Sequence, residues 1–134
     1  MRLAGCVLLC LVATGCGSDL ARVKGRVVDG AMPFRVEAGT QVSLRLSAIG
    51  VDGTPDPTKF YTAVLEAEGA FEVLASGGAL TPGTYQVSLD AFGSGVTKEL
   101  KSKLKPFASA GSKLRVRLTA GPNDITVDLA KPEG

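Results

Sequence analysis

Residues 40–48 read "TQVSLRLSA", and from the second residue onward apolar and polar side chains alternate. Val42, Leu44 and Leu46 fall on one side of an extended chain and Arg45 on the other, because successive side chains of a strand point to opposite faces. Such alternation is typical of an antiparallel strand with one face in the core and one in water. The stretch therefore predicts a half-buried β-strand and not a helix.

Similar patterns flank this stretch on both sides. Residues 21–30, "ARVKGRVVDG", predict a strand that ends near Asp29, and residues 84–91, "TYQVSLDA", predict another. Pro82 and Gly83 precede the second of these strands. They predict a type II turn, because Pro fixes φ at the first central position and Gly accepts the positive φ of the next.

Two further segments lie between these strands. Residues 51–59, "VDGTPDPTK", predict a loop, since proline cannot donate to a ladder and Asp, Gly and Thr favour turns. Residues 60–74, "FYTAVLEAEGAFEVL", predict a hairpin that turns at Glu68 and Gly69.

The C-terminal part predicts a second hairpin. Residues 113–130 read "KLRVRLTAGPNDITVDLA", and the apolar residues of its two halves would share one buried face. That register would place Asp128 opposite either Arg115 or Arg117 on the outer face. The preceding stretch, residues 96–107, fits helical spacing and strand alternation equally, so we expect an irregular connection with about one helical turn.

About seven short strands, frequent turn signals and no long helix favour an all-β fold, an antiparallel β-sandwich over residues 22–131. The segments "VKGRV" at 23–27, "EGAF" at 68–71 and "LTPGTYQV" at 80–87 resemble the pattern of transthyretin-like, carboxypeptidase regulatory-like domains. The resemblance covers roughly residues 22–92. It implies a prealbumin-like or immunoglobulin-like Greek key, but no single activity and no catalytic residues.

The N-terminus predicts export. Residues 1–15 combine an early Arg, a short apolar run and small residues, as in a secretory signal peptide. "VATGC" at 12–16 resembles the lipobox of bacterial lipoproteins, which implies that Cys16 carries acyl chains such as palmitate. The similar "LAGC" ends at Cys6, which leaves too few residues for a signal. We therefore expect lipidation at Cys16, a short tether over residues 16–21, and a location at the outer membrane facing the periplasm.

Composition restricts the chemistry of the protein. The chain has no His, which removes the commonest general base near neutral pH and excludes Ser-His and Cys-His catalysis. Asp52 and Asp56 share a loop but lack the spacing of an EF-hand calcium site. Most of the seven aromatic residues fall on predicted core faces, which disfavours an aromatic platform for carbohydrate. We expect no enzyme activity, no cofactor and no metal.

One segment is strongly basic. Residues 98–117 carry seven Lys or Arg residues and one acid, Glu99. Basic side chains near an anionic membrane surface each contribute about 1 kcal/mol to binding. The alternative is an ordinary solvated loop and strand face. The candidates for contact with an anionic surface are Lys98, Lys101, Lys103, Lys105, Lys113, Arg115 and Arg117.

These patterns predict a non-enzymatic, membrane-anchored envelope lipoprotein that serves as a structural or binding module for a protein or polymer. The alternative is an accessory or inhibitory subunit of an envelope enzyme or transporter. The expected partners are the membrane, through the lipid on Cys16, and an envelope protein or polymer, with no nucleic acid.

Overall fold

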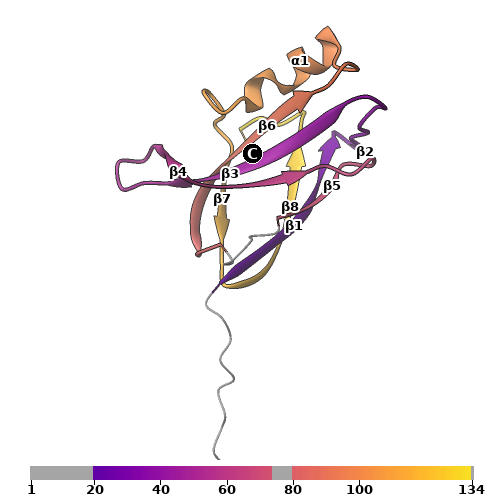
Figure 1. The fold of residues 1–134 in the computed structure, drawn as a ribbon. Coiled ribbons are helices and arrows are strands. Elements are labelled where there is room, and N and C mark those ends of the chain that lie inside the picture. The colour runs from indigo at the N-terminus through magenta and orange to yellow at the C-terminus, as the bar shows by residue number, and fades with distance from the viewer. Residues whose placement is uncertain (1–19, 74–79, 134) are drawn as a thin grey trace, which may run out of the picture.

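A computed structural model describes residues 20–73 and 80–133, which form two packed β-sheets (Figure 1). The first sheet contains β1 (Ala21–Asp29), β2 (Met32–Pro33), β5 (Ala70–Val73) and β8 (Gly121–Asp128). The second contains β3 (Gln41–Ile49), β4 (Pro55–Val64), β6 (Gly83–Phe92) and β7 (Arg115–Leu118). Two short helical segments follow β6, namely α1 (Lys98–Leu104) and the 3₁₀ turn η1 (Lys105–Phe107). The predicted all-β sandwich is confirmed.

The first sheet is organised around β1. The Val27 N–H donates to the Gly69 carbonyl and the Val27 carbonyl accepts from Phe34, so β5 and β2 follow one another along one edge. On the other edge β8 pairs with β1 over eight residues in parallel. The expectation of a purely antiparallel sandwich is therefore wrong at this pair.

The predicted C-terminal hairpin is also wrong. β7 pairs with β6 in the second sheet, whereas β8 crosses to the first sheet. Asp128 lies beside Val28, and Arg115 and Arg117 lie beside residues of β6. The apolar residues of both strands do face the core, but from opposite sheets. Strands that face each other across a core show the same alternation as strands that pair within one sheet.

The predicted hairpin over residues 60–74 fails for the same reason. The chain turns where expected, with the Gly69 N–H donating to the Glu66 carbonyl and Gly69 at a φ of 85°. However, β4 belongs to the second sheet and β5 to the first. This turn therefore connects two layers instead of two neighbouring strands.

The second sheet has the order β4-β3-β6-β7, and the strict alternation of β3 is confirmed by the burial of its apolar residues. β4 begins at Pro55, inside the predicted loop. Its prolines are tolerated because β4 lies at the edge of the sheet, where one side of the strand needs no ladder. Gly83 has a φ of 151°, far from the roughly 80° of a type II turn, so that turn prediction is wrong.

The core lies between the inner faces of the sheets, and its largest fully buried side chains are Tyr85 and Phe107. β6 is buried on both faces, since Gln86 and Ser88 on its outer side are 4% and 3% exposed. The Gln86 side-chain nitrogen donates to the Ser112 carbonyl at 2.9 Å, and the Ser112 hydroxyl donates to the Val87 carbonyl. The segment after η1 is thereby held against β6.

Residues 97–107 are more helical than expected. Thr97 caps α1, because its hydroxyl oxygen accepts from the Leu100 N–H at 3.2 Å. Leu104 and Phe107 are buried in the core, so the helical spacing prevails over the strand alternation. Because η1 continues α1 directly, the irregular connection with one helical turn is an underestimate.

α1 lies at the end of the sandwich opposite to the start of β1 (Figure 1). An ion pair between Lys103 and Asp29, the last residue of β1, ties the helix to the first sheet. No helix within residues 20–73 and 80–133 is long and apolar enough to cross a membrane.

Candidate functional site

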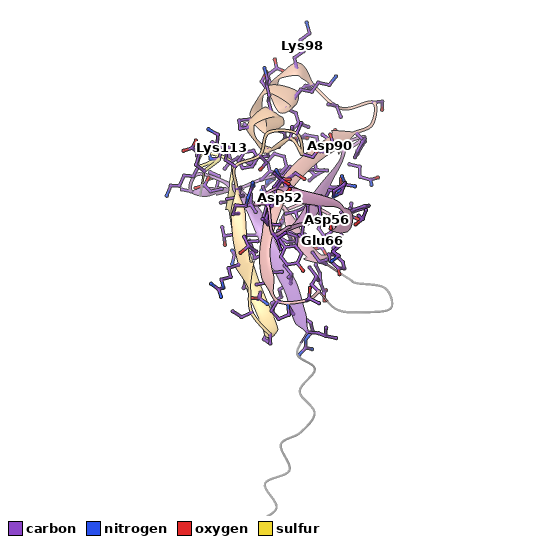
Figure 2. The ribbon with its side chains drawn as sticks, turned by 90° about the vertical axis from the view of Figure 1, so that its left-hand side faces the viewer. Asp52, Asp56, Glu66, Asp90, Lys98 and Lys113 are labelled. Carbon is purple, nitrogen blue, oxygen red and sulfur yellow. The ribbon has the colours of Figure 1, made fainter. Side chains whose placement is uncertain are left out.

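The structure divides the seven basic candidates into separate groups. Figure 2 shows Lys98 at the tip of the described part of the molecule, on the side of α1. Lys113 lies 3.4 Å from Glu133, and Lys103 pairs with Asp29. The four residues on α1 and η1 are Lys98, Lys101, Lys103 and Lys105, and the two on β7 are Arg115 and Arg117. They therefore lie on different elements, and their contact with an anionic surface stays a prediction.

A groove of about 240 Å³ lies on the second sheet, mainly over the outer faces of β3, β4 and β6. Most of its lining is polar and includes four hydroxyl groups, one guanidinium and one carboxylate. The lining residues are Ser43, Arg45, Thr62, Ser88, Leu89, Asp90, Phe92 and Ser109. We refer to it below as the outer groove.

The register of the sheet brings these side chains together. Residues directly opposite one another in antiparallel strands lie on the same face. Arg45 pairs with Thr62 of β4 on one side and with Ser88 of β6 on the other. Ser43 pairs with Asp90 two residues further along the strands. We call each such set of residues side by side across the strands on this face a row. Three strands far apart in sequence therefore build one polar surface.

Arg45 is the central cation of this surface. Its guanidinium carbon lies over the Phe60 ring, 3.8 Å from the ring centre, in a cation–π contact. Among the described residues, Arg45 forms no ion pair, and its guanidinium donates to no protein acceptor. A guanidinium has five N–H donors in a planar fork, so Arg45 keeps its full capacity for a carboxylate or another anion.

The hydroxyl groups beside Arg45 are similarly available. Within the described part of the chain, the Ser43, Thr62 and Ser88 hydroxyls make no hydrogen bond to another protein group. Ser88 is 3% exposed, and buried polar groups in folded proteins are nearly always hydrogen-bonded. Its hydroxyl oxygen is open to the outer groove, where water or a ligand bonds to it, since Thr40 Oγ1 is the one buried side-chain polar atom without a partner among the described residues.

Exposed apolar side chains flank the outer groove. Phe92, Phe60 and Val64 are 52%, 43% and 54% exposed, and all three lie on the outer face of the second sheet. The expectation that most aromatic residues face the core holds for five of them, which are Phe34, Tyr61, Phe71, Tyr85 and Phe107. Phe60 and Phe92 depart from it and provide ring surface beside the polar groups.

Two of the predicted basic residues extend the same face. Arg115 lies beside Gln86 and Arg117 beside Thr84, on the outer side of β7. The Arg115 guanidinium donates to the Ser112 carbonyl at 3.0 Å. With Arg45, three arginines share a face on which Asp90 supplies a carboxylate. Sequence reasoning placed Arg45 on a solvent face but gave no reason to select it, since its neighbours come from other strands.

The Asp52 and Asp56 carboxylates each accept hydrogen bonds from the threonine two residues further along the chain. The Thr54 hydroxyl and N–H hold the pKa of Asp52 below its usual value, and the Thr58 hydroxyl and N–H do the same for Asp56. In the described ranges no three metal-ligating residues form a group. The predicted lipidation site Cys16 lies outside the described residues.

Comparison of the chain with protein-family models, with curated proteins and with solved structures found no match. The transthyretin-like resemblance therefore stays a prediction.

Proposed function

We propose that this protein is a non-enzymatic binding module, held at a bacterial cell envelope by acyl chains on Cys16, and that its partner docks in the outer groove. One observation carries the proposal. The outer groove gathers a guanidinium and several hydroxyl groups that have no protein partner within the described residues, next to exposed aromatic rings. A ligand that replaces the water on these groups and covers the rings gains binding free energy.

The position of the groove suits an anchored domain. β1 begins at Ala21, five residues after Cys16, and a chain of that length spans at most about 18 Å. Nine residues of β1 then extend about 27 Å away from the anchored end. Asp90 and Phe92 lie in the half of β6 nearer to α1, so an upright domain presents the outer groove away from the membrane.

The same orientation places the lysines of α1 away from the membrane. The Debye length is about 8 Å at physiological ionic strength, so charges at the far end of β1 are screened from headgroups at the near end. In an upright domain these lysines face the periplasm and not the membrane that holds the anchor. The membrane contact then depends on the lipid alone.

The chemistry of the groove favours binding over catalysis. The chain contains no His, so the groove hydroxyls lack the usual base that would activate them as nucleophiles. Arg45 cannot serve as a base because a guanidinium does not lose its proton in proteins.

Two variants test the anchor. Cys16→Ala is expected to move the protein from the membrane fraction to the soluble fraction or to stall its processing, whereas Cys6→Ala should leave fractionation unchanged. Membrane fractionation of the Cys16→Ala protein identical to that of the parent would refute lipid anchoring.

A second pair of variants tests the docking site. The full chain is captured from detergent-solubilised membranes as wild type, as Arg45→Gln and as Arg26→Gln, an exposed arginine on the first sheet. We expect the co-purifying partner to be lost only in Arg45→Gln. An unchanged set of partners in Arg45→Gln would place docking elsewhere, and capture of an enzyme or transporter would indicate the accessory-subunit alternative.

A further inference from the structure

We infer that the ligand of the outer groove is an acidic glycan, a chain of sugar units that carry carboxylate groups. This inference rests on the proposed function, since it names the class of partner for the same groove. The argument combines three independent features of the face, which are its cations, its hydroxyl groups and its aromatic flanks.

The cations select an anion. Arg45 has no carboxylate within ion-pair distance in the described part of the chain, although Asp90 lies one row away on β6. Its guanidinium carbon lies 3.8 Å from the centre of the Phe60 ring, and this contact restricts the side chain before a ligand binds. Guanidinium and carboxylate match in a bidentate pair, which makes a carboxylate the natural partner of Arg45. Arg115 and Arg117 add positive charge further along the same face.

The hydroxyl groups select a ligand with many hydroxyls. Ser43, Thr62 and Ser88 each offer one donor and two acceptor positions, and Asp90 offers acceptors only. Sugar hydroxyls also both donate and accept, so they satisfy such a mixed lining. A carboxylate-rich peptide has only acceptors on its side chains and one N–H donor per residue on its backbone, whereas a sugar unit carries several hydroxyl donors.

The aromatic flanks select a ligand with apolar ring faces. Phe92 lies in the row of Gln41, and Phe60 lies in the row of Ser47, six residues further along β3. At about 3.4 Å per residue these rows are about 20 Å apart along the strands, which is longer than a single sugar ring. The C–H face of a sugar ring can cover an exposed phenyl ring and remove apolar surface from water. The groove therefore fits a chain of sugars better than a single small anion.

Titration calorimetry on the full chain in neutral detergent tests this inference. The probe is a short oligogalacturonate, and two matched ligands separate its properties. Its methyl ester keeps the sugar and loses the charge, whereas polyglutamate of equal charge keeps the charge and loses the sugar. The proteins compared are wild type, Arg45→Gln, Arg45→Lys and Arg26→Gln as the control.

We expect oligogalacturonate to bind the wild type, and the methyl ester and polyglutamate to bind about tenfold more weakly or not at all. Arg45→Gln should lose about tenfold in affinity, and Arg45→Lys should recover only part of it because an ammonium lacks the planar fork. Arg26→Gln should bind as the wild type does. Equal binding of polyglutamate would assign the face to a polyanionic protein, and equal binding of the ester would assign it to a neutral glycan, and either result overturns the inference.

The inference and the proposed function fail in different ways. Loss of the membrane-derived partner in Arg45→Gln, with no saccharide bound by the wild type, would leave the docking site standing and remove the acidic glycan. Saccharide binding that depends on Arg45, with an unchanged set of protein partners, would support the acidic glycan as ligand of the groove and would place the docking of the protein partner elsewhere.

Discussion

The outer faces of the two sheets place a cation at the same kind of position and surround it differently. In the first sheet, Lys24 on the central strand β1 has Glu72 of β5 on one side and Asp124 of β8 on the other. In the second sheet, Arg45 on the central strand β3 has Thr62 and Ser88 at the equivalent positions. Opposite charges side by side compensate one another, whereas Arg45 has only hydroxyls directly beside it. The charge of Lys24 on the first face is thus balanced by its neighbours, whereas the guanidinium of Arg45 on the second face keeps N–H donors that no neighbouring residue uses.

The largest loss of stability is expected on β6, whose inner face packs in the core and whose outer face lines the groove. Tyr85 on the inner face of β6 is 2% exposed, its ring meets Tyr61 edge to face at 6.4 Å, and its hydroxyl donates to the Thr81 carbonyl. Tyr85→Ala should lower the free energy of unfolding by about 3 to 5 kcal/mol. That is a large share of the roughly 5 to 15 kcal/mol available to a small domain, so most of the protein should unfold.

The matched variant is Ser88→Ala, on the outer face of the same strand. Its hydroxyl has no protein partner in the described residues, so its removal should change the free energy of unfolding by less than about 1 kcal/mol. Thermal or urea unfolding measures both variants. Similar losses in the two would contradict the division of β6 into a stability face and a recognition face.

The next effect concerns the close approach of strands in the first sheet. A Cβ atom added at Gly25 would lie 1.9 Å from the Ile125 carbonyl oxygen and 2.9 Å from the Phe71 ring. Gly25→Ala must therefore displace β8 or β5, and overpacking of this kind costs about 1 to 3 kcal/mol or more. Gly111→Ala is the control, because nothing lies within 4 Å of a Cβ there. Equal unfolding midpoints for the two variants would show that β1 and β8 separate easily.

The sequence predicts which strand faces are apolar better than it predicts which strands pair. The alternation along β1, β3 and β6 predicts which apolar residues face the core, but not that Ser47, Gln86 and Ser88 are buried on the opposite face. It does not predict which strands pair, since the apolar pattern is identical for a neighbour in the sheet and for a strand across the core. That is why the turns near Gly69 and Gly121 were mistaken for hairpins, and why the parallel pairing of β8 with β1 could not be foreseen.

The candidate site was less predictable than the fold. The sequence predicts Arg115 and Arg117 as contact residues because they belong to a run of basic residues. Arg45 stands alone between two serines and looks like any solvated strand residue until Ser88 and Thr62 are placed beside it. A site assembled from three strands carries no local signal in the sequence.

A smaller effect is expected from the segment that covers the outer side of β6. The Gln86 amide donates to the Ser112 carbonyl at 2.9 Å and to the Ser109 carbonyl at 3.3 Å. Gln86→Ala removes both bonds, but the Arg115 guanidinium still donates to the Ser112 carbonyl. We expect a loss of about 1 kcal/mol and faster amide hydrogen exchange in residues 108–114. Unchanged exchange in that segment would show that Arg115 and the Ser112 hydroxyl, which donates to the Val87 carbonyl, hold it without Gln86. Gln86→Glu is a useful second variant because it keeps the side-chain shape without the donor.

The smallest effect on stability depends on pH and comes from Asp128, at the end of β8 in the first sheet. The Ala130 N–H, and then the Gly30 N–H, donate to Asp128 and hold the pKa of its carboxyl below the ordinary value of 3.8. A carboxyl with a lowered pKa in the folded state stabilises that state above its unfolded pKa, and the contribution is lost as the pH falls through the folded value. The melting temperature of Asp128→Ala should therefore lie below that of the wild type at pH 7, and the difference should shrink as the pH falls below about 4. Other carboxyls titrate equally in both proteins, so the difference between the two curves isolates Asp128. A difference that stays constant from neutral to acid pH would mean that Asp128 stabilises the end of β8 through packing and not through the two hydrogen bonds to its charged form.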